Sequence, residues 1–321
     1  MRKVISLLLT VTLLFALAGC RKADAPKQAT AVPKLKVIAT VYPVYEFVRQ
    51  VGGDKVEVSM LLPAGAEPHA WEPTAKDLVK IREAKAVFYH GAGLEGWAAK
   101  LLTQDKLGST QAIEVSKGIP LLKEEGHNEH GHSHSKDHSS GQLHDEETDP
   151  HVWLDPVLAQ QEVRTIADAL AALDSENQSY YKSNADKYIS ELQALHKEFE
   201  AALTSAIKRE IVTNHAAFGY LAARYQLKQL AIMGLAPDAE PTPDKMAKIV
   251  QTVREHKIGY IFSETLVSAK LAETIARETG AKVLVLHPID QITESELKAG
   301  QNYLTLMRGN LANLKKALAG Q

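Results

Sequence analysis

The chain has 321 residues, 45% of them hydrophobic, and its 37 basic and 39 acidic side chains leave a formal net charge of −2. Such a balance, without a clustered basic excess, argues against a nucleic-acid-binding surface. The single cysteine, Cys20, excludes an intrachain disulfide and any zinc site built from several cysteines, although a chain of this length can bury a sufficient core without such crosslinks.

The N-terminus has the pattern of an export signal. A basic start precedes a mostly apolar run over residues 4–18, which is shorter than the roughly 20 residues of a membrane-spanning helix. Leu-Ala-Gly-Cys at positions 17–20 resembles a bacterial lipobox. We therefore predict a lipoprotein signal peptide over residues 1–19 and lipidation of Cys20; an ordinary cleaved signal with an incidental cysteine is the alternative. The polar residues 20–33 are expected to be a flexible tether.

Two blocks of alternating strands and helices follow. In the first block, β-rich runs predict strands at Lys36–Thr40, Val56–Leu62, Ala84–His90 and Ile113–Val115, with helices at Tyr45–Val51, Thr74–Glu83 and Leu94–Leu102. In the second block, strands are predicted at Glu210–Thr213, Gln229–Met233, Ile258–Ser263 and Lys282–His287, with helices at Ala217–Tyr225, Pro243–His256 and Ala269–Thr279. This alternation predicts parallel sheets flanked by helices. We expect an α/β fold with an N-terminal lobe over residues 34–173 and a C-terminal lobe over residues 208–321.

Residues 123–149 interrupt the first lobe with Gly, Ser, Asp, Glu and a tract of histidines. Since almost nothing in this segment is apolar, we expect a mobile surface loop. Imidazole is a common metal ligand, so the tract predicts auxiliary, low-affinity metal binding that raises the local metal concentration. A disordered loop that binds metal only because any histidine tract does is the alternative. The histidines of the tract are His127, His130, His132, His134, His138 and His144.

A long helical pattern lies between the blocks. Ser175 and Gln178 fit a capping box. A helix from Glu176 to Ile207 would be about 48 Å long, so residues 174–207 are predicted to be a rigid connector of the two lobes. Its apolar positions recur on one face, at Tyr181, Ala185, Tyr188, Ile189, Leu192, Leu195, Phe199 and Ala202.

Four polar residues outside the loop are candidates for a site. His69, His215 and Asp290 each lie just past a predicted strand, and His151 lies in the segment DPHVWLDP. Loops beyond the carboxyl ends of parallel strands hold the ligand sites of α/β sheets, so we expect these side chains to converge between the lobes. One histidine after a strand is usually a surface or core residue, but the shared placement favours a metal site. The remaining histidines are interpreted as structural, namely His90, His196, His256 and His287.

Several longer motifs resemble one known family. VIATVYPVYEF, LLPAGAEPHAWEPTAKD, GAGLEGW, DPHVWLDP, TNHAAFGYLAARYQL and EPTP occur in this order. Together they resemble the zinc-uptake (ZnuA-like) branch of the metal-binding solute-binding proteins of bacterial ABC transporters, from Leu35 to the C-terminus. The resemblance implies the metal-type periplasmic-binding-protein fold, in which two α/β lobes are joined by one long rigid helix.

The resemblance also implies a ligand set. It assigns His69, His151 and His215 as the ligand histidines and Asp290 as the carboxylate ligand. Glu67 is a rival for the fourth position, as is a water molecule; Glu264 is a further option. In manganese-binding relatives the position of His215 is typically glutamate, so a histidine there implies Zn²⁺. Three imidazoles and one carboxylate suit tetrahedral Zn²⁺, whereas Mn²⁺ favours more oxygen ligands.

We therefore expect a monomeric, extracytoplasmic zinc receptor, lipid-anchored to the bacterial cell membrane, that captures Zn²⁺ between its lobes and delivers it to an ABC-type permease. A manganese or iron receptor of the same fold and a metal-stabilised surface adhesin are the alternatives. Enzymatic functions fit poorly. Gly91–Gly96 with Glu114 matches a dinucleotide-binding fingerprint, but it follows the third strand of its lobe rather than the first. A zinc hydrolase would need an HExxH motif or a clear general base, which this sequence lacks.

Overall fold

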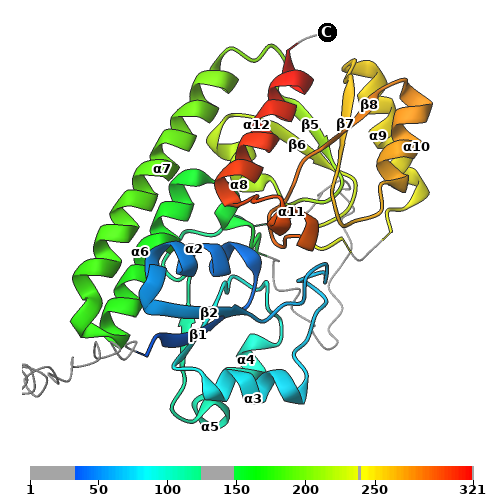
Figure 1. Ribbon diagram of the computed structural model, residues 1–321. Coiled ribbons are helices and arrows are strands. Elements are labelled where there is room, and N and C mark those ends of the chain that lie inside the picture. Colours follow the sequence, from blue (N-terminus) through cyan, green and yellow to red (C-terminus); the bar gives the residue numbers. More distant parts are fainter. Residues whose placement is uncertain (1–32, 124–147, 238–239, 320–321) are drawn as a thin grey trace, which may run out of the picture. The chain divides into compact units, whose positions relative to one another are not determined.

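The computed structural model describes residues 33–123, 148–237 and 240–319. Two parallel four-stranded sheets form its framework (Figure 1). The first has the strand order β2-β1-β3-β4, and its strands are Leu35–Ala39 (β1), Val56–Met60 (β2), Ala86–Tyr89 (β3) and Gln111–Glu114 (β4). The second has the order β6-β5-β7-β8, and its strands are Glu210–Thr213 (β5), Lys228–Ala231 (β6), Tyr260–Ser263 (β7) and Lys282–Val285 (β8). The predicted α/β class with two parallel sheets is confirmed.

The inner strands β3, β5 and β7 are short, largely apolar runs because both faces of the sheet are covered there. In β3, Ala86 and Phe88 pack into the core on one face of the sheet, and Val87 packs into a separate core on the other. This division follows from the alternation of side chains along a strand, and it explains why buried parallel strands read as nearly continuous apolar sequence.

The helices of the first lobe depart from the predicted bounds in two places. Helix α2 (Tyr42–Gly52) begins three residues early, because Pro43 lies in its first turn, where a missing N–H costs nothing. The predicted helix Leu94–Leu102 is wrong in extent: only α4 (Ala98–Leu101) and α5 (Gln104–Leu107) are helical. Residues 94–97 form bends and turns instead, in which the Glu95 carboxylate accepts the backbone N–H groups of His90 and Gly91.

Helix α3 (Ala75–Glu83) begins as predicted, directly after Thr74. The Thr74 hydroxyl accepts a hydrogen bond from the backbone N–H of Asp77, and the Asp77 carboxylate accepts one from the backbone N–H of Thr74. This capping box satisfies donors that the first turn of a helix leaves free.

The long connector is a pair of helices, α6 (Pro156–Leu173) and α7 (Gln178–Thr204), that pack along each other (Figure 1). The predicted capping box at Ser175 is wrong, since residues 175–177 form a 3₁₀ turn. There, the Asp174 carboxylate accepts hydrogen bonds from Asn177 Nδ2 (2.8 Å) and the Tyr181 hydroxyl (2.7 Å). Helix α7 is therefore about 40 Å long rather than 48 Å.

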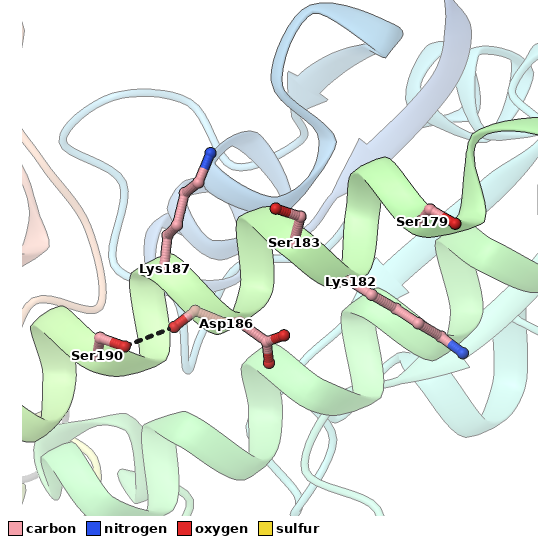
Figure 2. A pocket seen from close by; sticks show the side chains of 6 residues that line it. All are labelled: Ser179, Lys182, Ser183, Asp186, Lys187 and Ser190. Atoms are coloured by element: carbon pink, nitrogen blue, oxygen red, sulfur yellow. Dashed lines mark hydrogen bonds between the residues drawn. The ribbon is translucent and has the colours of Figure 1, made fainter.

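The outer face of α7 is polar, as the sequence predicts. Figure 2 shows Lys182, Asp186 and Ser190 among the serine, lysine and aspartate side chains that line a shallow hollow on this face. All of the lining residues are exposed, and the Ser190 hydroxyl donates to the backbone oxygen of Asp186. No buried polar group points into this hollow from its lining residues, so we assign it no function.

One apolar core joins the two lobes. It runs from Phe88 of the first sheet through Leu195 and Phe199 of α7 to Phe262 and Leu286 beside the second sheet. Burial of this continuous surface makes α7 a structural part of both lobes rather than a hinge between them.

None of the helices in the described part of the chain is both long and apolar enough to span a lipid bilayer. The helices of the second lobe are α8 (Gly219–Arg224), α9 (Pro243–Glu255), α10 (Lys270–Thr279), α11 (Glu294–Lys298) and α12 (Tyr303–Leu318).

Candidate metal centre

Three histidines from separate parts of the chain converge. His69 lies in the loop after β2, His151 in the segment before α6, and His215 in the loop after β5. One ring nitrogen of each lies within 4.8 Å of those of the other two, and Nε2 of His151 lies 3.4 Å from Nε2 of His215. The structure thus brings together the three predicted ligand histidines, at the carboxyl ends of the strands, as expected for an α/β ligand site.

The three rings differ in their exposure. His151 and His215 are fully buried, whereas His69 is partly exposed. His69 is thus the least buried of the three, although its Nε2 is buried as well. We call these three residues the histidine cluster.

A carboxylate holds the His151 ring from behind. The backbone N–H of His151 donates to Asp149 Oδ1 at 2.9 Å, and His151 Nδ1 lies 2.8 Å from the same oxygen. With Nδ1 donating to Asp149, the unprotonated Nε2 faces the centre of the cluster, the arrangement that metal-ligating histidines use. Asp149 is not among the residues predicted from the sequence. The signal was an aspartate two residues before a histidine, where its side chain can accept from the backbone.

A second carboxylate holds His215 in the same way. Glu264 Oε1 accepts the backbone N–H of His215 at 3.1 Å and lies 2.6 Å from His215 Nδ1. Glu264 follows β7, the strand next to β5, so it reaches the His215 ring from the adjacent strand end. Because Glu264 Oε1 already contacts His215, we favour a supporting role for Glu264 over the role of metal ligand that the sequence left open.

Burial and charge set the protonation of the three rings. Burial, together with the positive charges of His215 and His90, lowers the pKa of His69 to about 3. Burial and the neighbouring histidines also lower the pKa of His151 well below its ordinary value. Burial lowers the pKa of His215 as well, but the charge and hydrogen bond of Glu264 outweigh it, so that this pKa is raised. His69 and His151 are therefore neutral at pH 7, as a metal ligand must be.

Two carboxylates compete for a fourth position. Glu67, His69 and Asp290 form a second group of ligand atoms within 4.8 Å of one another. Both oxygens of Glu67 already accept backbone N–H groups, of His69 at 3.1 Å and of Ala70 at 2.9 Å. Asp290 is buried, its Oδ1 has no hydrogen-bond partner among the described residues, and burial raises its pKa to about 6. This orphaned oxygen favours Asp290 over Glu67.

The turn that carries Asp290 is strained. Ile289 has a φ of 59°, in the left-handed region that β-branched residues rarely adopt. Its backbone N–H donates to His287 Nδ1 at 2.9 Å, and the side chain is fully buried. Such strain costs on the order of 1–3 kcal/mol and persists only where the surroundings impose it. Here it fixes the direction of the neighbouring Asp290.

The dinucleotide-like motif has a different structural use. Glu95 accepts the backbone N–H groups of His90 (2.8 Å) and Gly91 (2.9 Å), and its Oε1 also lies against the Thr40 hydroxyl. Its carboxylate therefore fills the backbone cradle that a phosphate would need. Gly91 is required because a Cβ there would lie 2.5 Å from the side chain of Glu114.

The other candidate residues lie elsewhere. His90 Nδ1 is 3.1 Å from Glu162 in the core, and the exposed His256 pairs with Glu210 at 2.6 Å. His196 Nδ1 lies 3.1 Å from the Tyr225 hydroxyl. Within the described residues, none of the four histidines interpreted as structural belongs to a group that could hold a metal. Outside the described residues lie Cys20, His127, His130, His132, His134, His138 and His144.

Known proteins similar to this chain include zinc-binding and zinc-uptake proteins, and among the similar solved structures is the laminin-binding protein Lmb of Streptococcus agalactiae, described as having adhesin and metal-transporting activity (TM-score 0.78, 32% identity, covering 89% of this chain and 100% of Lmb). The family model for ZnuA, the periplasmic zinc-uptake complex component A, matches residues 37–317. The zinc-binding lipoprotein AdcA of Streptococcus pneumoniae serotype 4 is 41% identical over 318 residues, which are 98% of this chain and 61% of AdcA. The high-affinity zinc uptake system protein ZnuA of Bacillus subtilis is 39% identical over 285 residues, covering 89% of this chain and 88% of ZnuA. The crystal structure of the Zn(II)-bound ZnuA-like domain of S. pneumoniae AdcA has a TM-score of 0.75 and 39% identity, covering 89% of this chain and 100% of that domain. This chain therefore spans 61% of the length of AdcA.

Proposed function

This chain belongs to the ZnuA family of zinc-uptake complex components, and from this membership we propose its function. The family is one of solute-binding receptors rather than enzymes. In our proposal the chain is an extracytoplasmic receptor that captures Zn²⁺ between its two lobes, residues 34–173 and 208–321, and delivers it to an ABC-type permease. Lipid at Cys20 is its link to the membrane, and the receptor acts as a monomer.

The observation that carries this proposal is the convergence of three imidazole nitrogens within 4.8 Å of one another. Two of the rings are buried and backed by carboxylates at Nδ1. Zn²⁺ accepts three nitrogen ligands and one oxygen ligand at about 2.0–2.2 Å in a tetrahedral site. We therefore propose His69, His151 and His215 as ligands, with Asp290 as the fourth.

The geometry also suggests an order of capture. His69 is the least buried member of the set and is neutral at pH 7 because its pKa is about 3. It is thus placed to meet the incoming cation first, while the buried rings complete the shell. A site closed by four protein ligands holds the ion and leaves no position for a reactive water.

We also propose that the histidine tract between residues 127 and 144 binds zinc weakly and supplies it to the tight site. Its stem is attached close to that site, since Lys123 and Thr148 pair as an antiparallel bridge and Thr148 is three residues from His151. In this proposal, weak ligands in a segment attached at this stem raise the local zinc concentration without forming part of the tight site.

The test is a zinc titration in competition with a chelator, on the purified protein with and without residues 127–144, repeated against Mn²⁺. One tight site that survives the deletion and is not displaced by Mn²⁺ is expected. Tight binding that disappears with the deletion would refute the assignment of the histidine cluster. Displacement by Mn²⁺ would identify a manganese receptor of the same fold instead.

A further inference from the structure

Helix α8 contacts the residue that supports His151. The Tyr220 hydroxyl donates to the backbone oxygen of Asp149 at 2.7 Å and accepts the backbone N–H of Leu122 at 2.9 Å. Tyr220 is buried, and Asp149 and Leu122 are themselves joined by a backbone hydrogen bond of 2.9 Å. A side chain from the second lobe therefore fixes the backbone on which the Asp149 carboxylate stands.

The preceding residue, Gly219, fixes the carboxylate itself. A Cβ added at Gly219 would lie 2.5 Å from Asp149 Oδ2, closer than real Cβ contacts allow, whereas the next nearest atoms are 3.7 Å and 3.8 Å away. The glycine is needed for this contact and not for its backbone conformation, since its φ lies outside the positive range. Asp149 thus packs against the Cα of Gly219 with one oxygen and holds His151 with the other.

We propose that Gly219 and Tyr220 are positioning residues that aim His151 at the metal, acting through Asp149. The inference rests on the proposed zinc site and adds to it a link between the two buried ligands. Helix α8 starts at Gly219, four residues after His215. The position of α8 therefore affects both buried histidines: His215 because it directly precedes the helix in the chain, and His151 because Asp149 packs against the helix. The separation of the two Nε2 atoms depends on this helix.

The test compares Gly219→Ala with Gly309→Ala in the full-length protein. Gly309 is a suitable control because it lies inside α12 and a Cβ there meets nothing within 4 Å. We expect Gly219→Ala to weaken zinc binding by about 10- to 100-fold, the usual effect of disturbing a partner of a metal ligand, and Gly309→Ala to leave it unchanged. In the metal-free protein, ¹⁵N NMR of the imidazoles should show the His151 proton on Nδ1 in the parent chain, and a mixture of ring tautomers in Gly219→Ala.

A double variant separates this contact from a general loss of structure. Asp149→Ala removes the carboxylate that the new methyl group would strike, so adding Gly219→Ala to it should cost no further affinity. An equal cost of Gly219→Ala in both backgrounds would overturn the proposal, as would unchanged His151 signals in the single variant. If the parent chain itself lacked a tight zinc site, the proposed function would fail instead, and the NMR comparison would still decide the positioning role.

Tyr220→Phe is the milder variant, should Gly219→Ala fail to fold. Loss of one hydroxyl should weaken zinc binding roughly 3- to 10-fold. Tyr188→Phe is the control, because the Tyr188 hydroxyl is buried without a hydrogen-bond partner among the described residues. Equal zinc affinities for Tyr220→Phe and Tyr188→Phe would contradict a role of the Tyr220 hydroxyl.

Discussion

Two imidazoles of the histidine cluster are fixed by carboxylates, and the third is not. His151 and His215 each present Nδ1 to a carboxylate oxygen, whereas Nε2 of the partly exposed His69 is without a hydrogen-bond partner among the described residues. The buried pair therefore provides a fixed half of the site, and His69, whose buried Nε2 has no partner among the described residues, provides the half that is not fixed by a carboxylate. This difference gives the individual residues separable roles.

Replacing His215 should remove the tight site. His215→Ala deletes one of three nitrogen ligands and leaves the Glu264 carboxylate without its partner, so we expect zinc affinity to fall by at least about 100-fold. His256→Ala, at an exposed position paired with Glu210, is the control and should bind as the parent does. Chelator competition measures both. Tight binding retained in His215→Ala would rule out the histidine cluster as the site.

The fourth ligand can be identified by two isosteric changes. Asp290→Asn should weaken zinc binding by about 10-fold or more, because the buried Oδ1 of Asp290 has no other hydrogen-bond partner in the described residues. Glu67→Gln should have a smaller effect, because the Glu67 oxygens already accept two backbone N–H groups. The opposite ranking of the two dissociation constants would assign the ligand to Glu67.

At the scale of elements, the strands were predictable and the helix ends were not. Buried parallel strands such as β3 and β5 are recognisable in the sequence as short apolar runs. His69 and His215 are predicted as site residues because each follows a predicted strand. Helix α6 was missed, although Ala159, Val163 and Leu170 recur at helical spacing and are buried. The contact of Asp149 with Gly219 could not be predicted, since it joins residues 70 positions apart in the chain.

The cap of α3 should affect stability without affecting zinc binding. Thr74→Ala removes the hydroxyl that accepts the N–H of Asp77, which typically costs about 1 kcal/mol. Thr252→Ala, in the interior of α9, is the control and should be neutral or slightly stabilising. Urea unfolding of the metal-free protein measures both free energies. A change in zinc affinity for Thr74→Ala would show that α3 is coupled to the site.

Helix α11 should contribute a pH-dependent stability. Glu296, in this helix, contacts His287 and accepts hydrogen bonds from Thr293. These contacts outweigh the effect of burial and lower the pKa of Glu296 to about 2. Because the folded pKa is below the unfolded value of about 4.5, the contribution is fully present above that value and is lost as the pH falls toward 2.

The variant Glu296→Gln measures this contribution. It should lower the free energy of unfolding at pH 6 by about 1–2 kcal/mol relative to the parent chain, and the difference should shrink at pH 3. Glu294→Gln, at an exposed position on the same helix, should show neither effect. A constant difference between pH 6 and pH 3 for Glu296→Gln would mean that the carboxylate is not stabilised by these partners.

At the scale of the molecule, the shared core predicts that the two lobes unfold together. The same apolar cluster contains Phe88 of the first sheet, Leu195 of α7 and Phe262 of the second, so separating the lobes would expose the surface that stabilises each of them. Leu195→Ala, at a fully buried position in this cluster, should reduce the free energy of unfolding by about 2–5 kcal/mol. Trp71 and Trp97 lie against each other in the first lobe, whereas Trp153 Nε1 donates to the backbone oxygen of Pro288 in the second. In a Trp153→Phe background, tryptophan fluorescence therefore reports the first lobe.

Hydrogen exchange of the β5 and β7 amides reports the second lobe in the same experiment. The two probes should give one coincident transition in the parent chain and in Leu195→Ala, because the substitution weakens a core that belongs to both lobes. A fluorescence transition that separates from the exchange data would mean that α7 is a hinge between independent lobes. Coincident transitions instead mean that neither lobe keeps its fold once the shared core around Leu195 is lost, so that the two lobes and α7 form one cooperative unit.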